Sequence, residues 1–466
     1  MTLPDPTDLA TLDRDVARAH AAWTKWQRAL AGDPASVEDE APLDRFRHVA
    51  GQTTYEALGR ASSGTADGLL RDGLRRWIYA LMQARIAQPL DVERAKTVAE
   101  ASAHVSVPKP HTTSWREAWR GLLGAESVTE RGAWLGPIAE RAPALAAIER
   151  RRAERRLEAE SRMRFESGDP LFSTPLAALT EGAEALLAHT DDLARHLLAE
   201  ARRRAELPND PPRAIDAIAV SLGRDAPEGW PARLGWAWFD ATFGQFARGL
   251  RLGTPPLPEA LGASSFARAC AVFGGALRVA GASPSLPFAL AREPEFTAMH
   301  RFACVFGALP ASAAFQRRIL GNVARVADAQ ARTLTRTLLF ASRLEATRFL
   351  LAIESAPDAF EERTLRLFGA PLPRALAGAW PTRRDDGRAR LAGFLTALPL
   401  AKELVDRFDE DWFGNPRAVT HLRALASAPA RELEVPGTER GETENDARYF
   451  GSAARALAHT FEETLG

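Results

Sequence analysis

The chain is poor in several features, and each shortage excludes a class of protein. Only two of its 466 residues are cysteines, Cys270 and Cys304, so neither a disulfide framework nor a CxxC metal knuckle can form. No run of about 18 uncharged apolar residues occurs, which argues against a transmembrane helix. Residues 1–15 have neither a basic stretch nor an apolar core, so no signal peptide is visible. We therefore expect a cytoplasmic protein without a membrane partner.

The chain also lacks a net charge. Its 60 Lys and Arg residues balance 60 Asp and Glu residues, whereas proteins that bind nucleic acid usually carry a basic excess or a concentrated basic face. The basic run 150–156 is interleaved with acids and is followed by Glu158/Arg162 and Glu160/Arg164 at i,i+4. This pattern favours a solvated helix, with a phosphate-binding patch as the alternative. We expect no nucleic-acid partner.

Helical periodicity dominates what is present. Trp236, Phe239, Phe243, Phe246 and Leu250 repeat at three and four residues, which indicates one buried face of a helix. The apolar segment 283–290, bounded by prolines, is one of few places where a strand fits. The sequence predicts an all-α fold with at most a small β element. The predicted helices are 7–31, 43–61, 66–88, 92–102, 113–123, 128–140, 143–164, 175–206, 236–250, 296–309, 311–354, one from 358, 388–408, 416–426 and 446–465.

Proline-rich segments suggest how the chain is divided. Pro208, Pro211 and Pro212 mark a hinge, 254–258 is predicted to be a second linker, and 430–445 an exposed loop. We predict an N-terminal helical region over 1–207, a second helical region over 208–429, and the loop with a C-terminal helix over 430–466. A single two-lobed domain is the alternative.

Several common catalytic motifs are missing. The sequence has no GxxxxGK[ST] phosphate loop and no GxSxG nucleophile elbow. Its Gly274-Gly275 pair lies in a helical context that lacks the strand-turn-helix setting of a dinucleotide site. An acidic group could bind a cation, but such groups more often precede or cap a helix, here the one opened by Asn415-Pro416. The acidic residues are Asp406, Asp409, Glu410 and Asp411.

The segment 299–305, Met-His-Arg-Phe-Ala-Cys-Val, has the outline of a zinc-peptidase helix. In a His-Glu-x-x-His helix, two His four residues apart bind the metal and the Glu activates its water. His300 stands in the place of the first His, Arg301 in that of the Glu, and Cys304 in that of the second His. A guanidinium cannot act as a base, and its charge repels a metal ion. Cys304 could serve as a thiolate ligand or pair with His300, although its apolar setting favours an inert thiol.

The order of elements around this helix resembles the mostly helical zinc oligopeptidases, the thimet-oligopeptidase-like branch of the gluzincins. The apolar segment before the helix, the long helices around it and the acidic-aromatic loop 408–416 carry the resemblance, which spans about 176–416. It implies a two-lobed helical protein with an interlobe cleft, and hydrolysis of short peptides by residues that this chain lacks. No third metal ligand is evident, although Asp328 and Glu345 lie downstream. The late residues Tyr449 and His421 are expected on ordinary helical surfaces.

The leading hypothesis is a metallopeptidase-like pseudoenzyme that binds no cofactor. It would act as a binding or regulatory module for a protein or peptide partner, with His300, Arg301 and Cys304 as a vestigial site. One alternative is a zinc-dependent oligopeptidase whose ligands are His300, Cys304 and an acidic residue. The other is a helical interaction scaffold unrelated to peptidases, in which His300 is an ordinary buried histidine.

Overall fold

A computed structural model describes most of the chain. The described residues are 8–32, 41–59, 66–105, 111–125, 127–162, 176–207, 213–223, 230, 234–258, 262–354, 357–377, 387–430 and 443–466. The predicted hinge at 208–212 and residues 431–442 of the predicted loop lie outside them.

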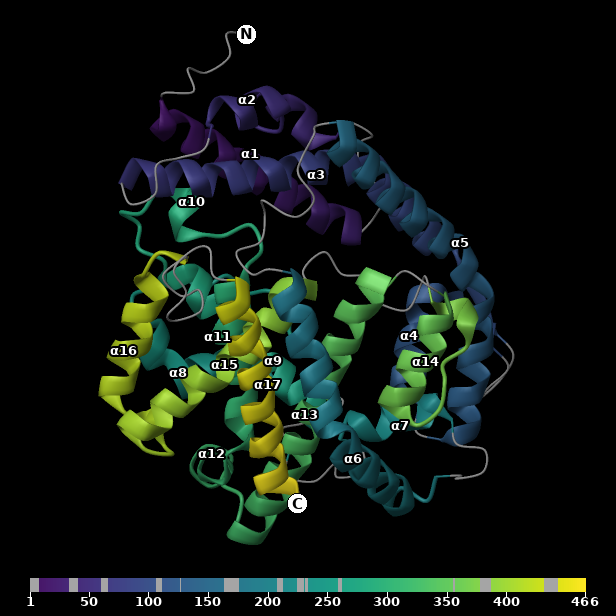
Figure 1. The fold of residues 1–466 in the computed structure, drawn as a ribbon. Helices are drawn as coiled ribbons and strands as arrows, with labels where there is room; N and C mark the ends of the chain where they lie inside the picture. The colour runs from purple at the N-terminus through teal and green to yellow at the C-terminus, as the bar shows by residue number, and fades with distance from the viewer. Residues whose placement is uncertain are drawn as a thin grey trace.

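The fold is all-α, as predicted, apart from one short hairpin (Figure 1). In the hairpin, β1 (Ser102–Val105) pairs antiparallel with β2 (His111–Ser114), with Ser102 opposite Ser114. None of the described helices is long and apolar enough to span a bilayer. The α-helices are α1 (Leu9–Gly32), α2 (Gln52–Ala57), α3 (Ala66–Glu100), α4 (Trp115–Gly124), α5 (Val128–Arg162), α6 (Leu176–Arg204), α7 (Ala214–Ser221), α8 (Trp236–Ala247), α9 (Ala263–Gly281), α10 (Phe288–Ala291), α11 (Thr297–Ala308), α12 (Ala313–Arg318), α13 (Ala324–Glu354), α14 (Pro357–Phe368), α15 (Gly387–Phe408), α16 (Pro416–Ser427) and α17 (Thr443–Leu465).

Some predicted elements are wrong. The apolar segment 283–290 forms no strand: it leads into α10, whose first two N–H groups, those of Phe288 and Ala289, donate to the Asp13 carboxylate at 2.8 Å each. The helix predicted over 43–61 is instead a 3-10 turn (Pro42–Phe46) followed by α2. Conversely, α3 and α5 run through prolines at which the sequence predicted breaks. Tertiary packing overrides local propensity at these points.

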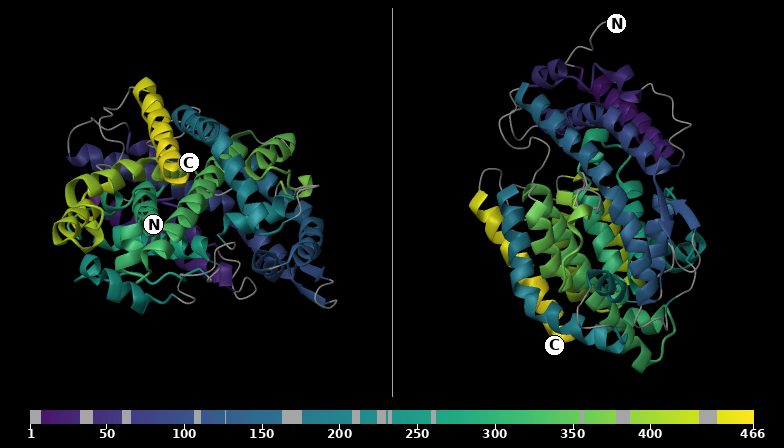
Figure 2. Two further views of the ribbon diagram at one scale, coloured as in Figure 1. Left: turned by 90° about the horizontal axis from the view of Figure 1, so that it is seen from below. Right: turned by 90° about the vertical axis from the view of Figure 1, so that its right-hand side faces the viewer.

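The helices are arranged around three main apolar cores. One core joins α4 to α7 with α13, α14, α15 and α17. A second, rich in phenylalanine, lies between α8, α9, α11, α15 and α16. The third is formed by α1, α2, α3 and α10, which lie across the top of the view in Figure 1. Helices α6 and α17 lie side by side although more than 200 positions separate them in the chain (Figure 2).

Helix α11 carries the peptidase-like segment and is held between α9 and α15 at very short range. A Cβ atom placed on Gly274 of α9 would lie 2.5 Å from the Phe302 carbonyl oxygen. A Cβ atom on Gly393 of α15 would lie 2.6 Å from the His300 Cβ. Since real Cβ atoms do not approach so closely, glycine is required on both flanking helices. The backbone of α11 is therefore fixed where the motif residues stand.

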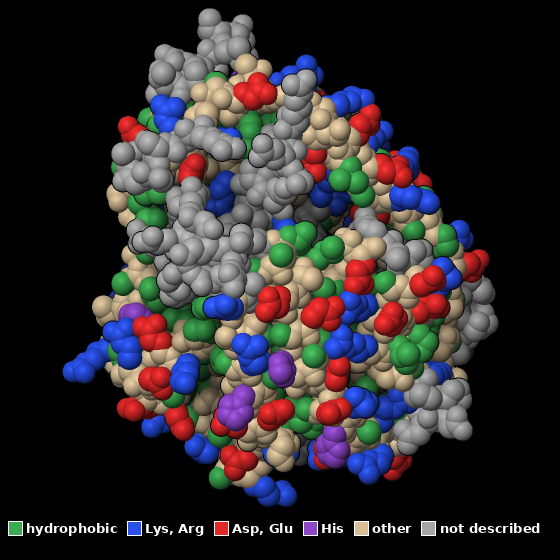
Figure 3. All heavy atoms as spheres, viewed as in Figure 1, with side chains coloured by type: hydrophobic (Ala, Val, Ile, Leu, Met, Phe, Trp, Pro, Cys, Tyr) green, Lys and Arg blue, Asp and Glu red, His purple; other side chains and the backbone are tan. Residues whose placement is uncertain are grey.

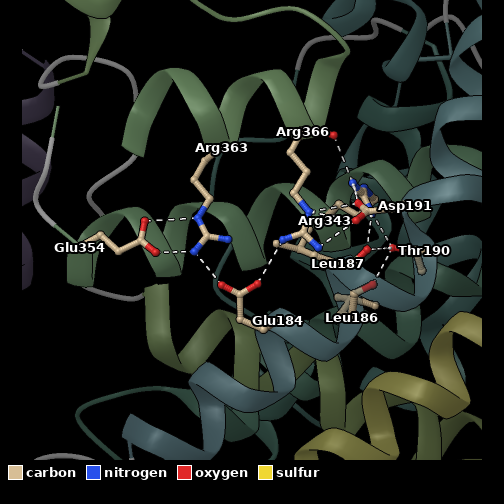
Figure 4. Close-up of polar contacts among 9 residues, drawn as sticks. All are labelled: Glu184, Leu186, Leu187, Thr190, Asp191, Arg343, Glu354, Arg363 and Arg366. Atoms are coloured by element: carbon tan, nitrogen blue, oxygen red, sulfur yellow. Dashed lines mark hydrogen bonds and ion pairs between the residues drawn. The ribbon is translucent and has the colours of Figure 1, made fainter. Parts of the chain in front are cut away.

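A partly buried polar network ties α6, α13 and α14 together (Figure 4). Arg343 of α13 is fully buried, and its guanidinium donates to the Leu187 carbonyl at 3.0 Å and to the Thr190 hydroxyl at 2.7 Å. It also donates to Asp191 at 2.7 Å, and Arg366 of α14 binds the same carboxylate at 2.9 Å. Arginine suits this position because its planar group presents several donors in fixed directions.

The outer surface mixes both signs of charge. On the face seen in Figure 3, Lys and Arg side chains alternate with Asp and Glu. Within the basic run 150–156, Arg152 lies 3.1 Å from Asp91, Arg151 pairs with Glu93, and Arg162 further along pairs with Glu158. These pairs agree with a solvated, ion-paired helix rather than a phosphate-binding patch.

Candidate functional site

The start of α11 is fixed by an acidic cap. Phe296, the residue before the helix, has a left-handed backbone (φ 61°, ψ 27°). Its carbonyl accepts the His300 N–H at 2.9 Å, and the Glu293 carboxylate accepts the N–H of Ala298. Glu293 is buried, and a carboxylate at a helix N-terminus satisfies free N–H groups and the helix dipole. The register of the motif residues is thus set from this end.

The two leading motif residues are buried rather than open to a ligand. His300 is 9% exposed and Arg301 is 6% exposed. The Nε atom of Arg301 donates to the Thr396 carbonyl on α15 at 3.2 Å. Because Gly393 lies in close contact with the backbone at 300 and 301, α15 covers this part of α11. Arg301 therefore joins two helices in the core.

The surroundings of Arg301 are acidic. Burial lowers the pKa of its guanidinium, and Tyr449, Glu293 and Glu403 act in the opposite direction. Arginine keeps its charge at neutral pH, so the core here holds a permanent cation. Tyr449, expected on an ordinary helical surface, instead lies beside it: burial raises the pKa of the Tyr449 hydroxyl, and Arg301 opposes that shift. The sequence held no spacing signal that could link residues so far apart in the chain.

The surroundings of Cys304 favour its protonated thiol. Burial is the main cause that raises its pKa to about 12, while Arg390 acts in the opposite direction and Glu345 adds a smaller increase. A thiol must lose its proton to bind a metal or to attack a substrate. The environment of Cys304 thus disfavours both roles, as its apolar sequence context predicts.

The two acidic candidates for a third ligand lie in different surroundings. Asp328 is exposed and lies 3.7 Å from Arg317 on the surface. Glu345 is buried and is close enough to Cys304 to affect its pKa, but it accepts from Arg348 at 3.0 Å and from Arg390 at 2.9 Å. Of the two, only Glu345 is brought near the motif, and two guanidinium groups already hold it.

The remaining sequence candidates have structural roles. His421 lies with its Nε2 atom 3.1 Å from a Glu403 carboxylate oxygen. In the acidic loop, Asp411 pairs with Arg318. Asn415 caps α16 by accepting the Arg417 N–H at 2.9 Å, as the Asn-Pro signal predicts.

The residues around α11 do not fit a zinc site. One imidazole, one thiol with a raised pKa and a buried cation stand where the metal chemistry needs two ligands and a base. Among the residues that the structure describes, no group of three or more His, Cys, Asp or Glu side chains is placed to hold a metal ion.

Comparisons with known proteins identify the fold. The chain matches a carboxypeptidase from Pyrococcus furiosus over 99% of both chains, with a TM-score of 0.52 and 12% identity. A candidate peptidase from Chlamydophila abortus matches with a TM-score of 0.50 and 12% identity, over 98% of this chain and 92% of that one. A candidate oligoendopeptidase F from Bacillus anthracis matches with a TM-score of 0.53 and 11% identity, over 96% and 84%. This chain has a peptidase-like fold.

The likeness extends beyond the region 176–416 on which the sequence resemblance was based, because it covers nearly the whole chain. No protein-family model matches the sequence, and no curated protein does. At these identities the likeness concerns the fold alone, and the chemistry must be argued from the residues present.

Proposed function

We propose that this protein is a cytoplasmic, peptidase-like scaffold that does not hydrolyse peptides and acts by binding a protein or peptide partner. The observation that carries the proposal is the position of Arg301. A peptidase of the His-Glu-x-x-His type needs a carboxylate at this position to activate water. Here a buried guanidinium donates to the Thr396 carbonyl and lies among acidic side chains.

The other residues of the motif support the same proposal. Neither the thiol of Cys304, with its raised pKa, nor the ion-paired Glu345 is free to complete a coordination sphere with His300. Retaining the peptidase-like helix arrangement while losing the ligands is consistent with a surface that still receives a partner.

Metal analysis and peptide hydrolysis test the proposal together. We expect the purified protein to hold zinc well below one equivalent, and to cleave no member of a short-peptide library with added zinc, cobalt or manganese. The expected positive result is that some library peptides bind saturably and are not cleaved. Fluorescence anisotropy measures this binding.

A matched pair of variants makes the test specific. His300→Ala removes the one imidazole of the motif, and His459→Ala removes an exposed histidine on α17. Stoichiometric zinc that is lost in His300→Ala and retained in His459→Ala would refute the proposal, as would chelator-sensitive cleavage. If no peptide binds, the partner is not a short peptide, and the proposal is then restricted to folded protein partners.

A further inference from the structure

A pocket of about 810 Å³ lies between α1, Arg251 and the segment that joins α9 to α10. It is separate from the peptidase-like helix, so a ligand of this pocket is independent of the proposed function. Its volume is within the range of small-molecule sites. Its apolar lining comes from alanines of α1 and from Val279, Ala280, Leu286 and Phe288.

The charges of this pocket have one sign. Lys25 and Arg28 of α1, Arg251, and Arg292 line it. None of the lining residues, all of them in the described part of the chain, is an Asp or a Glu. In a chain whose charges balance overall, four cations around one cavity make a local excess that attracts anions.

The described acidic side chains do not neutralise these cations. Within the described residues, no ion pair joins any of the four to an acidic side chain. Of the four, only Arg292 is half-buried, whereas the half-buried Arg76, Arg152 and Arg390 are each paired with a carboxylate. Asp13, an acid of the same helix α1, is occupied by the two N–H groups that begin α10. Among the residues that the structure describes, no carboxylate therefore competes with a ligand for the positive charge of the pocket.

The positive charge of Arg292 is held in a partly desolvated position, which costs free energy. It is half-buried and lies over the Phe288 ring, with its guanidinium carbon 5.7 Å from the ring centroid. Burial lowers the pKa of Arg292. A half-buried cation that no described carboxylate pairs with is unfavourable, and a bound anion would relieve this cost.

The neutral polar groups of the pocket suit an oxyanion. Burial, and then the charge of Arg292, lower the pKa of His20 to about 4, so its ring is neutral at physiological pH. The His20 Nε2 atom lies 3.3 Å from the Thr24 hydroxyl, which also lines the cavity together with Ser283. The ring of His20 packs against Trp77 at 4.9 Å, which holds it in place.

We propose that this pocket binds a small phosphorylated molecule with at least two negative charges. Arginine forks match phosphate oxygens in pairs, and a phosphate or diphosphate brings enough charge to balance several cations, which a single carboxylate does not. The apolar lining would receive the organic part of such a ligand.

Calorimetric titration of the full chain at low salt tests this assignment, with pyrophosphate and ADP as probes. Lys25→Ala/Arg251→Ala removes two exposed cations of the pocket without disturbing the core. Arg325→Ala removes an exposed arginine at the start of α13 that does not line the pocket and serves as the matched control. A thermal melt of each variant checks that it is folded.

We expect pyrophosphate to bind, and its affinity to fall about tenfold per pocket cation removed, as the loss of charge-assisted hydrogen bonds predicts. Arg292→Gln should weaken binding to a similar degree, and Arg325→Ala should change it less than about twofold. ADP binding more tightly than pyrophosphate would show that the organic part uses the apolar lining, and equal binding would show a diphosphate site alone.

Three results would overturn the assignment. The first is no binding of either probe up to about 10 mM, a limit at which an affinity of this kind is negligible. The second is the same affinity in Lys25→Ala/Arg251→Ala and Arg325→Ala. The third is binding of citrate without binding of pyrophosphate or ADP, which would exclude the phosphate class.

Discussion

Replacing Arg301 by glutamate would place a carboxylate where a His-Glu-x-x-His helix has its base, and we expect the change to destabilise the protein. The new carboxylate would lie in a buried position beside Glu293 and Glu403, whose charges now favour the guanidinium. It would also leave the Thr396 carbonyl without the donor that binds it at 3.2 Å.

The size of the effect follows from burial. Removing one partner from a buried charged arrangement typically costs about 3–5 kcal/mol, because the remaining charges are left uncompensated. With an unfolding entropy of about 2.1 cal/mol/K per residue over 466 residues, 1 kcal/mol lowers the Tm by about 1 °C. Arg301→Glu should therefore lower the Tm by about 3–5 °C.

Two further variants isolate the cause. Arg301→Met keeps the apolar stem and loses the hydrogen bond, so it should cost about 1–2 kcal/mol. Arg325→Glu reverses an exposed charge and should change stability by less than about 0.5 kcal/mol. Differential scanning calorimetry measures all three. The reasoning is wrong if Arg301→Glu melts within about 1 °C of the wild type, or if Arg301→Met is the less stable of the two.

Four other measurements have defined outcomes. Asp191→Asn leaves the buried Arg343 without its carboxylate and should lower the free energy of unfolding by about 2 kcal/mol, less than for a fully buried pair because Asp191 is partly solvated. Arg343→Met should lower it less than Asp191→Asn does, and equal losses by urea denaturation would contradict this. Partial burial raises the pKa of Asp191, but its arginine partners outweigh this and the net shift is downward. The ionised Asp191 therefore stabilises the fold above about pH 4, and this stabilisation is lost as the pH falls through the lowered pKa. In acid, the Tm of Asp191→Asn should consequently change less with pH than that of the wild type. Gly393→Ala should cost about 1–3 kcal/mol through the clash with α11, whereas Gly136→Ala, in open space on α5, should be neutral or slightly stabilising in the same melts. Cys304 should react slowly with a thiol reagent at neutral pH, because its pKa is raised to about 12, and labelling as fast as that of a free thiol would contradict the raised pKa.

Local patterns in the chain were sufficient for the fold class. The aromatic stripe that begins at Trp236 forms the buried face of α8, and the Asn415-Pro416 pair begins α16, since both signals act within one or two helical turns. The outline at His300 also predicted the peptidase-like fold that the comparisons support. Breaks predicted at prolines in α3 and α5 were wrong, because packing against distant helices outweighs the local penalty.

The contacts of the motif with distant helices could not be inferred from the chain. The raised pKa of Cys304 agrees with the expectation from its apolar neighbours, which stand within one helical turn. The contacts of Arg301 with Thr396 and of Gly393 with His300 join helices about 90 residues apart, and no spacing rule connects them.

The helical character, the lack of a catalytic carboxylate at position 301 and the overall balance of charge are properties of the amino-acid sequence alone, because each depends on residue identity and short-range periodicity. Which of the charges are neutralised depends on the folded state. Folding places Arg301 near the carboxylates of Glu293 and Glu403. It also brings Lys25, Arg251 and Arg292 together around a cavity whose lining residues include no Asp or Glu. Coulomb energies depend on distance through space and on burial, and neither is a function of separation along the chain.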